Sequence, residues 1–156
     1  MEILKALDIR IVSPEDHDLH ALIECLDAEL LQIYPAQGIF SVDFSNPEVK
    51  QMTFCVAYLN KTPVGCGGLR PLDEQSAELK RFFVISACRG KGVASAILDF
   101  LEGQAGQQGF SVIRLETGPK QPEAIGLYRK FGYKEIEAYG EYTGCAYSYC
   151  MEKHLL

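Results

Sequence analysis

Residues 89–94 read Arg89-Gly90-Lys91-Gly92-Val93-Ala94 and join a strand-like run, residues 78–84, to a helix-like run, residues 94–102. Glycines allow a sharp turn, and the first turn of a helix leaves backbone N–H groups free with a partial positive charge. Arg89 and Lys91 add full positive charges. We therefore expect the amides of residues 90–95 to bind a phosphate, and a ligand that carries a pyrophosphate is the leading hypothesis.

The turn alone does not identify the ligand, because many such turns carry a glycine and a basic residue for geometry and solubility only. It is not a P-loop, since Gly90-Lys91 is followed by Gly92 where that motif requires serine or threonine. It also lacks the three glycines of the dinucleotide-binding fingerprint. The pattern that it matches is Arg/Gln-x-x-Gly-x-Gly/Ala, as Arg89, Gly92 and Ala94.

This pattern resembles the acetyl-coenzyme A signature of the GNAT superfamily of N-acetyltransferases. A second stretch, residues 121–133, resembles the next signature of that family, an Ala-Ile-x-Leu-Tyr helix followed by Phe-Gly-Tyr. The resemblance covers about residues 56–153, with both motifs in the family's order. The stretch ending Tyr139-Gly140-Glu141-Tyr142 resembles, less specifically, a bacterial subgroup of small-molecule acetyltransferases. Ala94 replaces a more common glycine, and its small side chain still lets a pyrophosphate approach.

The resemblance implies that acetyl-CoA is the co-substrate, that no metal is needed and that an amine receives the acetyl group. It also implies that strands 78–84 and 112–117 splay apart around the pantetheine arm, which pairs with the edge of residues 82–84. A backbone N–H of that edge is expected to polarise the thioester carbonyl. The residues expected to contact acetyl-CoA are Phe82, Phe83, Val84, Arg89, Gly90, Lys91, Gly92, Val93, Ala94, Ser95, Thr117, Ala124, Leu127 and Tyr128.

Tyr128 occupies the tyrosine position of the second signature, and the resemblance makes it the candidate that protonates the departing thiolate. A phenol and a thiol have similar pKa values, about 8.5–10, so little driving force is wasted in the transfer. A tyrosine that only packs and hydrogen-bonds to the co-substrate is the alternative.

Two glutamates are candidates for the base that deprotonates the amine. Glu78, eleven residues before Arg89, matches the base position in the histone-acetylating branch of the superfamily. Glu116 matches the base position in the branch that acetylates ribosomal protein N-termini. The sequence leaves both open with a slight preference for Glu78, and both can instead be solvated strand ends paired with Lys80 or Arg81.

Length and composition favour one soluble domain spanning residues 1–156, with 47% hydrophobic and 23% charged residues. No run approaches the roughly 20 apolar residues of a membrane span, and residues 1–6 lack the features of a signal peptide. We therefore expect a cytoplasmic protein that does not bind a membrane. A net charge of −6 argues against a nucleic acid partner and weakly favours a cationic acceptor such as an amine.

The six cysteines form no C-x-x-C pair and mostly lie in apolar runs, which favours buried free thiols over disulfides or a zinc site. The three histidines are too scattered to suggest a metal site. Cys88 beside Arg89 suggests a nucleophile, but no histidine is near it in sequence. Direct attack of the amine in a ternary complex is therefore the preferred mechanism.

The expected fold is α+β, a GNAT-like mixed and mostly antiparallel sheet flanked by helices on both faces. Helical spacing predicts a helix that begins at Ser13-Pro14 and ends at Tyr34-Pro35. A second helix is expected directly after the turn at residues 89–92, and a third is expected to begin at Gln121. Strands are expected at residues 9–12, 52–59, 64–69, 78–84, 112–117 and 147–153, with a further strand opened by Gly132.

Three loop and turn features bear on the site. Residues 60–63 are expected to turn a hairpin, and Gly65, Gly67 and Gly68 predict a bulge or a close backbone approach in its second strand. Residues 37–50 lack periodicity and are expected to form a loop that shapes the acceptor pocket.

Three functions remain open at this point. The preferred one is acetylation of a small molecule or an amino-acid-like amine, and an enclosed pocket built by residues 34–50 and 139–145, with Tyr142 lining it, would favour it. An open groove beside residues 78–84 would favour a protein N-terminus or lysine as acceptor. A non-catalytic CoA-binding sensor is the third function. Pairing of late strands between two copies would give a homodimer.

Overall fold

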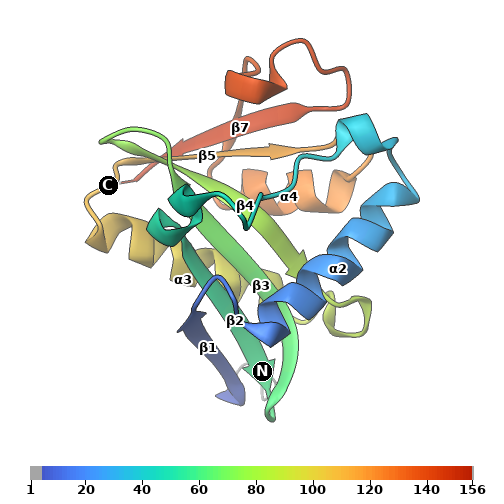
Figure 1. Cartoon of the computed structure of the whole chain (residues 1–156), viewed down its shortest axis with the longest axis vertical. Coiled ribbons are helices and arrows are strands. Elements are labelled where there is room, and N and C mark those ends of the chain that lie inside the picture. The colour runs from blue at the N-terminus through green and yellow to red at the C-terminus, as the bar shows by residue number, and fades with distance from the viewer. Residues whose placement is uncertain (1–4, 156) are drawn as a thin grey trace.

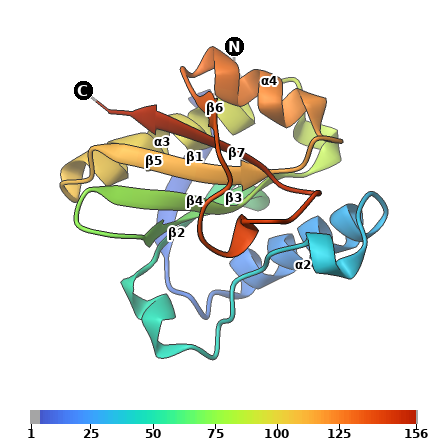
Figure 2. The same cartoon turned by 90° about the horizontal axis from the view of Figure 1, so that it is seen from above.

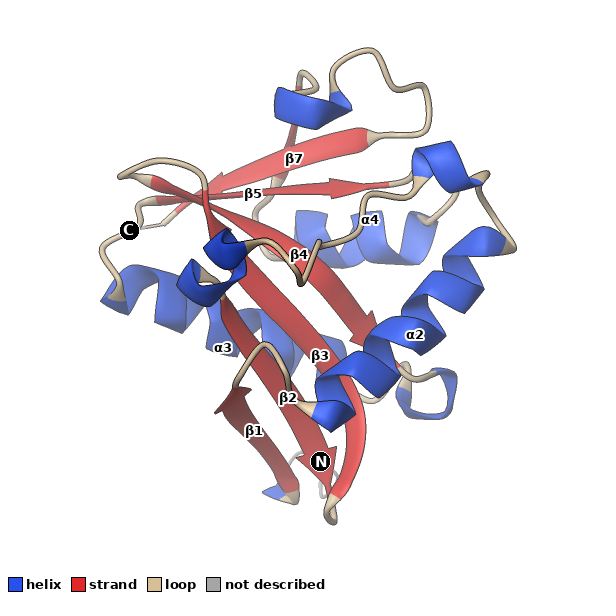
Figure 3. Cartoon of the chain, in the orientation of Figure 1, coloured by secondary structure: helices blue, strands red, loops and turns tan. Residues whose placement is uncertain are grey.

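The computed structural model describes residues 5–155. Within this range the chain forms one seven-stranded sheet of order β1-β2-β3-β4-β5-β7-β6, in which β4–β5 is the one parallel pair (Figures 1 and 3). The strands are β1 (Leu7–Val12), β2 (Thr53–Leu59), β3 (Thr62–Pro71), β4 (Ser76–Val84), β5 (Val112–Thr117), β6 (Lys134–Ile136) and β7 (Tyr149–His154). The α-helices are α2 (His17–Leu31), α3 (Val93–Gln107) and α4 (Pro122–Lys130), and the 3-10 helices are η1 (Ala36–Gly38), η2 (Pro47–Gln51), η3 (Ser86–Cys88) and η4 (Gly140–Tyr142).

Helices cover both faces of the sheet, α2 on one and α3 with α4 on the other (Figure 2). Helix α2 packs on Phe54 and Val56 of β2. The alternate residues of the same strand, Cys55 and Ala57, belong to the core beneath α3. Because successive side chains of a strand point to opposite faces, β2 contributes to two hydrophobic cores. The predicted α+β class with helices on both faces is confirmed.

The sheet opens between β4 and β5. Their pairing begins at Ser76 and ends with Leu79 opposite Leu115. Two residues later Arg81 has a left-handed φ of 53°, and the register of β4 against β3 shifts at this point. Such a bulge bends the strand and redirects its edge. Residues 82–84 therefore diverge from β5, as the family resemblance implied.

Glycines in β3 allow α3 to lie close to the sheet. A Cβ atom on Gly67 would lie 2.8 Å from Cδ1 of Leu101, and one on Gly65 would lie 2.7 Å from Cδ1 of Ile97. On the other face, a Cβ atom on Gly68 would lie 2.8 Å from the ring of Phe54. The predicted close approach is confirmed. The register of β3 against β2 also shifts between Ala57 and Tyr58, which leaves Val64 as an extra residue in β3.

Helix α2 begins later than Ser13. Its N-cap is Asp16, whose side chain accepts a hydrogen bond of 3.0 Å from the backbone N–H of Leu19. The carbonyl of Ser13 instead accepts the N–H of Asp16 at 3.1 Å, which makes residues 13–16 a turn. An Asp side chain three residues before a free N–H is a strong cap, so the prediction of a Ser13 cap is wrong.

Two strand boundaries also differ from the predicted ones. Asn60 and Lys61 both have positive φ, so the hairpin turn takes two residues and β3 already begins at Thr62. The last strand begins at Tyr149 instead of residue 147, because Tyr147 packs edge-on against the ring of Tyr34 at 6.4 Å. Helix α2 ends at Leu31, before Tyr34.

Candidate active site

The turn before α3 presents a helix N-terminus to a groove. Gly92 is the N-cap with a left-handed φ of 88°, and it carries no side chain that could bond to the helix N–H groups. Gly90 has a φ of 75°, which also favours glycine. The free N–H groups of the first turn of α3 are therefore available to an anion.

This turn borders a cavity of about 590 Å³ between β4, α3 and α4, which we call the groove. It is also lined by Leu26 and Glu29 of α2 and by Ile33, just after that helix. The residues expected to contact acetyl-CoA that line it are Phe82, Phe83, Val84, Arg89, Gly90, Gly92, Ala94, Ser95, Ala124 and Leu127. Most of the expected contact residues are therefore brought together in one cavity.

Four of the expected contact residues do not line the groove. The Val93 side chain is 1% exposed in the core beneath α3, so only its backbone can serve a ligand. The Lys91 ammonium donates to the carbonyl of Ala87 at 3.2 Å. Thr117 and Tyr128 line a second cavity instead.

Arg89 is held by protein groups. Its Nε donates to the Val84 carbonyl at 2.9 Å, and one terminal nitrogen lies 2.8 Å from both carboxylate oxygens of Glu29. The guanidinium also lies over the ring of Phe83, 5.5 Å from its centre. Arg89 thus ties the turn to α2 and β4, and Glu29 compensates its charge.

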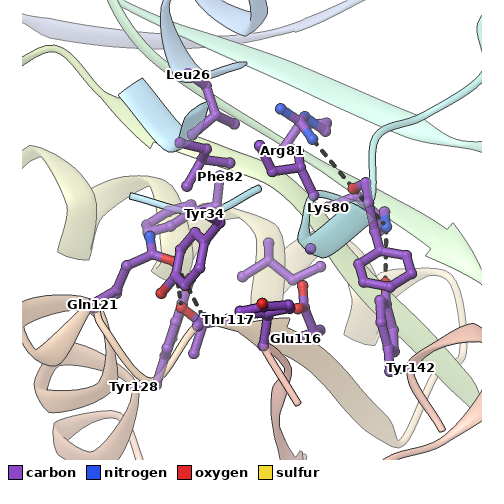
Figure 4. A pocket seen from close by; sticks show the side chains of 18 residues that line it. Leu26, Tyr34, Lys80, Arg81, Phe82, Glu116, Thr117, Gln121, Tyr128 and Tyr142 are labelled. Carbon is purple, nitrogen blue, oxygen red and sulfur yellow. Dashed lines mark hydrogen bonds between the residues drawn. The ribbon is translucent and has the colours of Figure 1, made fainter. Parts of the chain in front are cut away.

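The second cavity, which we call the inner pocket, has a volume of about 120 Å³ (Figure 4). It lies where β4 and β5 diverge, with α2 and α4 as further walls. Phe82 and Ala124 line both this pocket and the groove, as do Leu26 and Gln121. The groove and the inner pocket are therefore adjacent, with these four side chains at their common boundary.

Glu116 projects into the inner pocket from β5 (Figure 4). Burial raises the pKa of its carboxyl to about 7, although a hydrogen bond of 2.9 Å from Ser148 and the positive charge of Lys80 both lower it. A carboxylate with such a pKa can take up a proton near neutral pH.

Glu78, the other candidate base, lines neither cavity. Its side chain is 0% exposed and forms an ion pair with Arg70. It also accepts hydrogen bonds from the hydroxyls of Tyr139 at 2.7 Å and Tyr142 at 2.6 Å. These partners occupy both carboxylate oxygens and hold Glu78 behind the wall that Tyr142 forms.

Tyr128 lines the inner pocket from α4 (Figure 4). Its ring packs against Phe82 and Tyr133, with ring centres 5.9 and 5.8 Å apart. Burial first, and the nearby Glu116 second, raise the pKa of its phenol. No side chain or carbonyl in residues 5–155 bonds to its hydroxyl, which leaves that group free for a ligand.

Cys88 is 9% exposed and belongs to the core beneath α3. It lines neither the groove nor the inner pocket. All six cysteines are free thiols. Cys88 is therefore not placed to receive an acetyl group.

Sequence reasoning missed part of the pocket wall. Lys80 and Arg81 both line the pocket and are nearly buried, at 5% and 7% exposure. Tyr34 lines it too, and its hydroxyl accepts a hydrogen bond of 3.0 Å from the backbone N–H of Lys120. Lys80 and Arg81 could have been recognised from their place in β4. Charged residues are rarely buried without partners, so two adjacent ones in a strand covered on both faces indicate a specific role. Tyr142 lines the pocket as predicted.

Residues 5–155 contain neither a cluster of metal-ligating side chains nor a membrane-spanning helix. No group of three or more His, Cys, Asp or Glu side chains lies close enough to hold a metal ion. None of the described helices combines the length and apolarity needed to cross a membrane.

The family follows from comparison with known proteins. Residues 19–133 match the model of the acetyltransferase (GNAT) family, and the chain belongs to this family. It is 35% identical over 145 residues to the IAA acetyltransferase of Azospirillum brasilense, and the aligned region covers 92% of this chain and 94% of that protein. The protein is an acetyl-CoA-dependent acyltransferase of the GNAT class.

Solved structures agree on the fold. A crystal structure described as an acyl-CoA N-acyltransferase from Klebsiella pneumoniae superposes on this chain with a TM-score of 0.82 at 29% identity. The superposition covers 96% of this chain and 98% of that one. A GNAT acetyltransferase from Elizabethkingia anophelis, solved with acetyl-CoA bound, gives a TM-score of 0.73 at 16% identity over 96% and 99% of the two chains. The latter similarity shows a shared fold.

Proposed function

We propose that this protein transfers the acetyl group of acetyl-CoA directly to the amine of a small molecule, with both substrates bound at once. The observation that carries the proposal is the junction of the two cavities at Phe82 and Ala124. Glu116 and Tyr128, a candidate base and a candidate acid, lie on the inner side of that junction. Acid, base and entry path thus meet in one place.

The groove suits acetyl-CoA in hydrogen bonding. The N-terminus of α3 at Gly92 offers N–H groups to the pyrophosphate. The edge of residues 82–84, which diverges from β5, offers N–H and C=O groups to the amide arm, as an added strand would. Acetyl-CoA supplies the thioester, and in this arrangement its acetyl end lies at Phe82 and Ala124.

Glu116 is the base in this proposal. With a pKa of about 7 its carboxylate is half ionised near neutral pH, where it can still take a proton from an incoming ammonium or amine. Glu78 is proposed to fix the pocket wall, since Arg70, Tyr139 and Tyr142 already saturate its carboxylate.

Tyr128 is the acid. The N–C bond to the acetyl group forms as the C–S bond breaks, the amine proton passes to Glu116, and the phenol proton of Tyr128 passes to the sulfur. Because its hydroxyl is free of protein partners, Tyr128 can turn toward the sulfur. Its raised pKa keeps the phenol protonated before the transfer. It also separates the phenol pKa from that of the thiol, so the proton transfer has less driving force than the ordinary pKa values suggest.

The size of the inner pocket favours a small acceptor. Its volume of about 120 Å³ is far below the roughly 300–1,000 Å³ of sites that bury drug-sized ligands. Gly38 of η1 and Tyr142 of η4 form part of its wall. Both segments in which we expected a pocket for a small acceptor, residues 34–50 and 139–145, thus contribute to the wall.

Release of free CoA thiol from acetyl-CoA tests the proposal. The acceptors are a panel of small primary amines and amino acids, IAA because of the Azospirillum relative, and peptides with a free N-terminus or lysine. We expect thiol release with small amines and a product heavier by one acetyl group. Turnover of peptides alone would overturn the small-molecule acceptor, and binding of acetyl-CoA without turnover of any acceptor would indicate a sensor.

A second arm tests direct transfer. The enzyme is incubated with acetyl-CoA without acceptor, and its mass is measured. An unmodified mass and an active Cys88→Ala variant are expected. A stable acetyl-enzyme that passes its acetyl group to the amine would contradict direct attack.

A further inference from the structure

Lys80 carries a charge into the protein without a direct anionic partner. Its residue is 5% exposed, and its Nζ donates to the Tyr142 hydroxyl at 2.9 Å and to the Phe40 carbonyl at 3.4 Å. Both partners are uncharged, and no carboxylate of residues 5–155 lies within 4.0 Å of Nζ. An ammonium has three N–H donors, so one remains for a ligand.

Arg81 adds a second unsatisfied donor beside it. Its side chain is 3% exposed and pairs with Asp27, and one terminal nitrogen donates to the Phe40 carbonyl at 3.2 Å. Its Nε is buried without any hydrogen-bond partner. A buried donor left unpaired costs free energy, and buried charges are normally paired. Because this nitrogen has almost no accessible surface, a ligand in the pocket does not reach it, and Arg81 acts on the pocket through its charge, which Asp27 offsets in part.

The two cations lie in the wall of the pocket that also holds the proposed base. Lys80, Arg81 and Glu116 all line the inner pocket (Figure 4). Burial lowers the pKa of the Lys80 ammonium, and Glu116 is among the nearby carboxylates whose charges partly offset this. The charge of Lys80 in turn lowers the pKa of Glu116. One small ligand can thus contact both a cation and a carboxylate.

We infer that the acceptor is itself a carboxylate-bearing amine, a short amino acid whose carboxylate binds Lys80 beside Arg81 while its amine faces Glu116. The inference rests on the proposed function and names its substrate class. It also separates a free amino acid from a protein N-terminus, because the first residue of a protein has an amide in place of that carboxylate.

NMR of the lysine side chains tests the inference independently of catalytic activity. The protein is loaded with CoA and labelled with ¹³C at the lysine Cε, and the signal lost in Lys80→Met is assigned to Lys80. Glycine, alanine, serine and leucine are then titrated against their amides. We expect an amino acid to move the Lys80 signal and its matched amide to leave it in place. An unmoved signal with all four acids, or equal shifts with the amides, overturns the inference.

Kinetics on the same pairs give the second test. A charge-assisted hydrogen bond to the carboxylate predicts that kcat/KM for the acid exceeds that for its amide by about 10- to 100-fold. Lys80→Met, which keeps the apolar stem, should abolish that ratio. Lys50→Met is the control, since Lys50 is exposed on η2 and lines neither cavity.

The outcomes distinguish this inference from the proposed function. Efficient acetylation of amines without a carboxylate, with the ratio near one, would overturn the inference and leave the small-molecule activity intact. Peptide turnover without amino acid turnover would overturn both. A ratio that survives Lys80→Met would place the carboxylate elsewhere and overturn the inference.

Discussion

The hydroxyl of Tyr142 donates a hydrogen bond of 2.6 Å to Oε2 of Glu78. The same hydroxyl accepts from Lys80 at 2.9 Å, so it lies between the inner pocket and a carboxylate sealed behind it. Tyr139 shares that carboxylate oxygen, and Arg70 binds the other. Glu78 is thereby engaged by the protein, whereas Glu116, the other candidate base, lines the inner pocket.

Glu78→Gln is expected to lower stability more than catalysis. It removes the buried partner of Arg70 and disturbs two tyrosine hydroxyls. Arg70 is 34% exposed and keeps Glu141 at 3.1 Å, so the cost should stay below the roughly 3–5 kcal/mol of breaking a fully buried pair. Urea unfolding measures the loss, and the rate per folded molecule should fall less than tenfold. A variant as stable as wild type whose rate falls a hundredfold or more would identify Glu78 as the base.

Tyr128→Phe separates a catalytic phenol from a packing ring. Because the hydroxyl has no protein partner in residues 5–155, its removal should change the free energy of unfolding by less than about 0.5 kcal/mol. Loss of the acid should lower kcat by about 10²-fold or more. Tyr133→Phe is the control, since its hydroxyl bonds to Glu102 at 2.9 Å away from both cavities. An unchanged kcat in Tyr128→Phe would contradict the acid role.

Gly92→Glu is expected to abolish the binding of acetyl-CoA. A side chain at a φ of 88° is strained, and a carboxylate at the N-cap would repel the pyrophosphate. Wild type should be stabilised by about 2.7 kcal/mol at a hundredfold excess of acetyl-CoA over its Kd, read as a thermal shift. Gly103→Glu, on the open side of α3, controls for added charge. A full shift in Gly92→Glu would contradict binding at this turn.

Glu116→Gln is expected to stabilise the protein at high pH. The folded-state pKa of about 7 exceeds the ordinary 4.5, so the ionised form is disfavoured by folding, and stability falls as pH rises from about 4.5 to 7. At pH 8 the variant should gain up to about 3 kcal/mol, and at pH 4 nothing. Thermal melts at both pH values measure the difference. Equal stability at pH 8 would show that Glu116 has an ordinary pKa.

The sequence predicted the features that local pattern encodes. The turn at residues 89–94 and the helix at residues 122–130 both lie where their motifs placed them, because glycine geometry and helical spacing act over a few residues. The neighbouring positions of β4 and β5 and the opening between them came with the family resemblance. The start of α2 was missed because a Ser-Pro pair and Asp16 are both acceptable caps, and only the fold decides between them.

The choice of base could not be predicted. Glu78 and Glu116 are both acidic residues in central strands, and the difference between them is made by partners distant in sequence. Tyr139 and Tyr142 contact Glu78 across 61 and 64 residues, and Ser148 contacts Glu116 across 32. The ion pair of Arg89 could not be predicted for the same reason, because its partner Glu29 lies 60 residues earlier, in α2. Such contacts follow from tertiary packing and carry no local signal.

The pH dependence of kcat, measured for wild type and Glu116→Gln with one turned-over amine, tests the central claim most directly. We predict that wild-type kcat rises with pH through about 7, as Glu116 loses its proton and becomes a base, and that Ser148→Ala moves this rise to higher pH by removing a hydrogen bond that lowers the pKa. In Glu116→Gln the rise should be absent and kcat about 10²–10⁴-fold lower at pH 8. A variant that keeps both the rise and the rate would contradict the account.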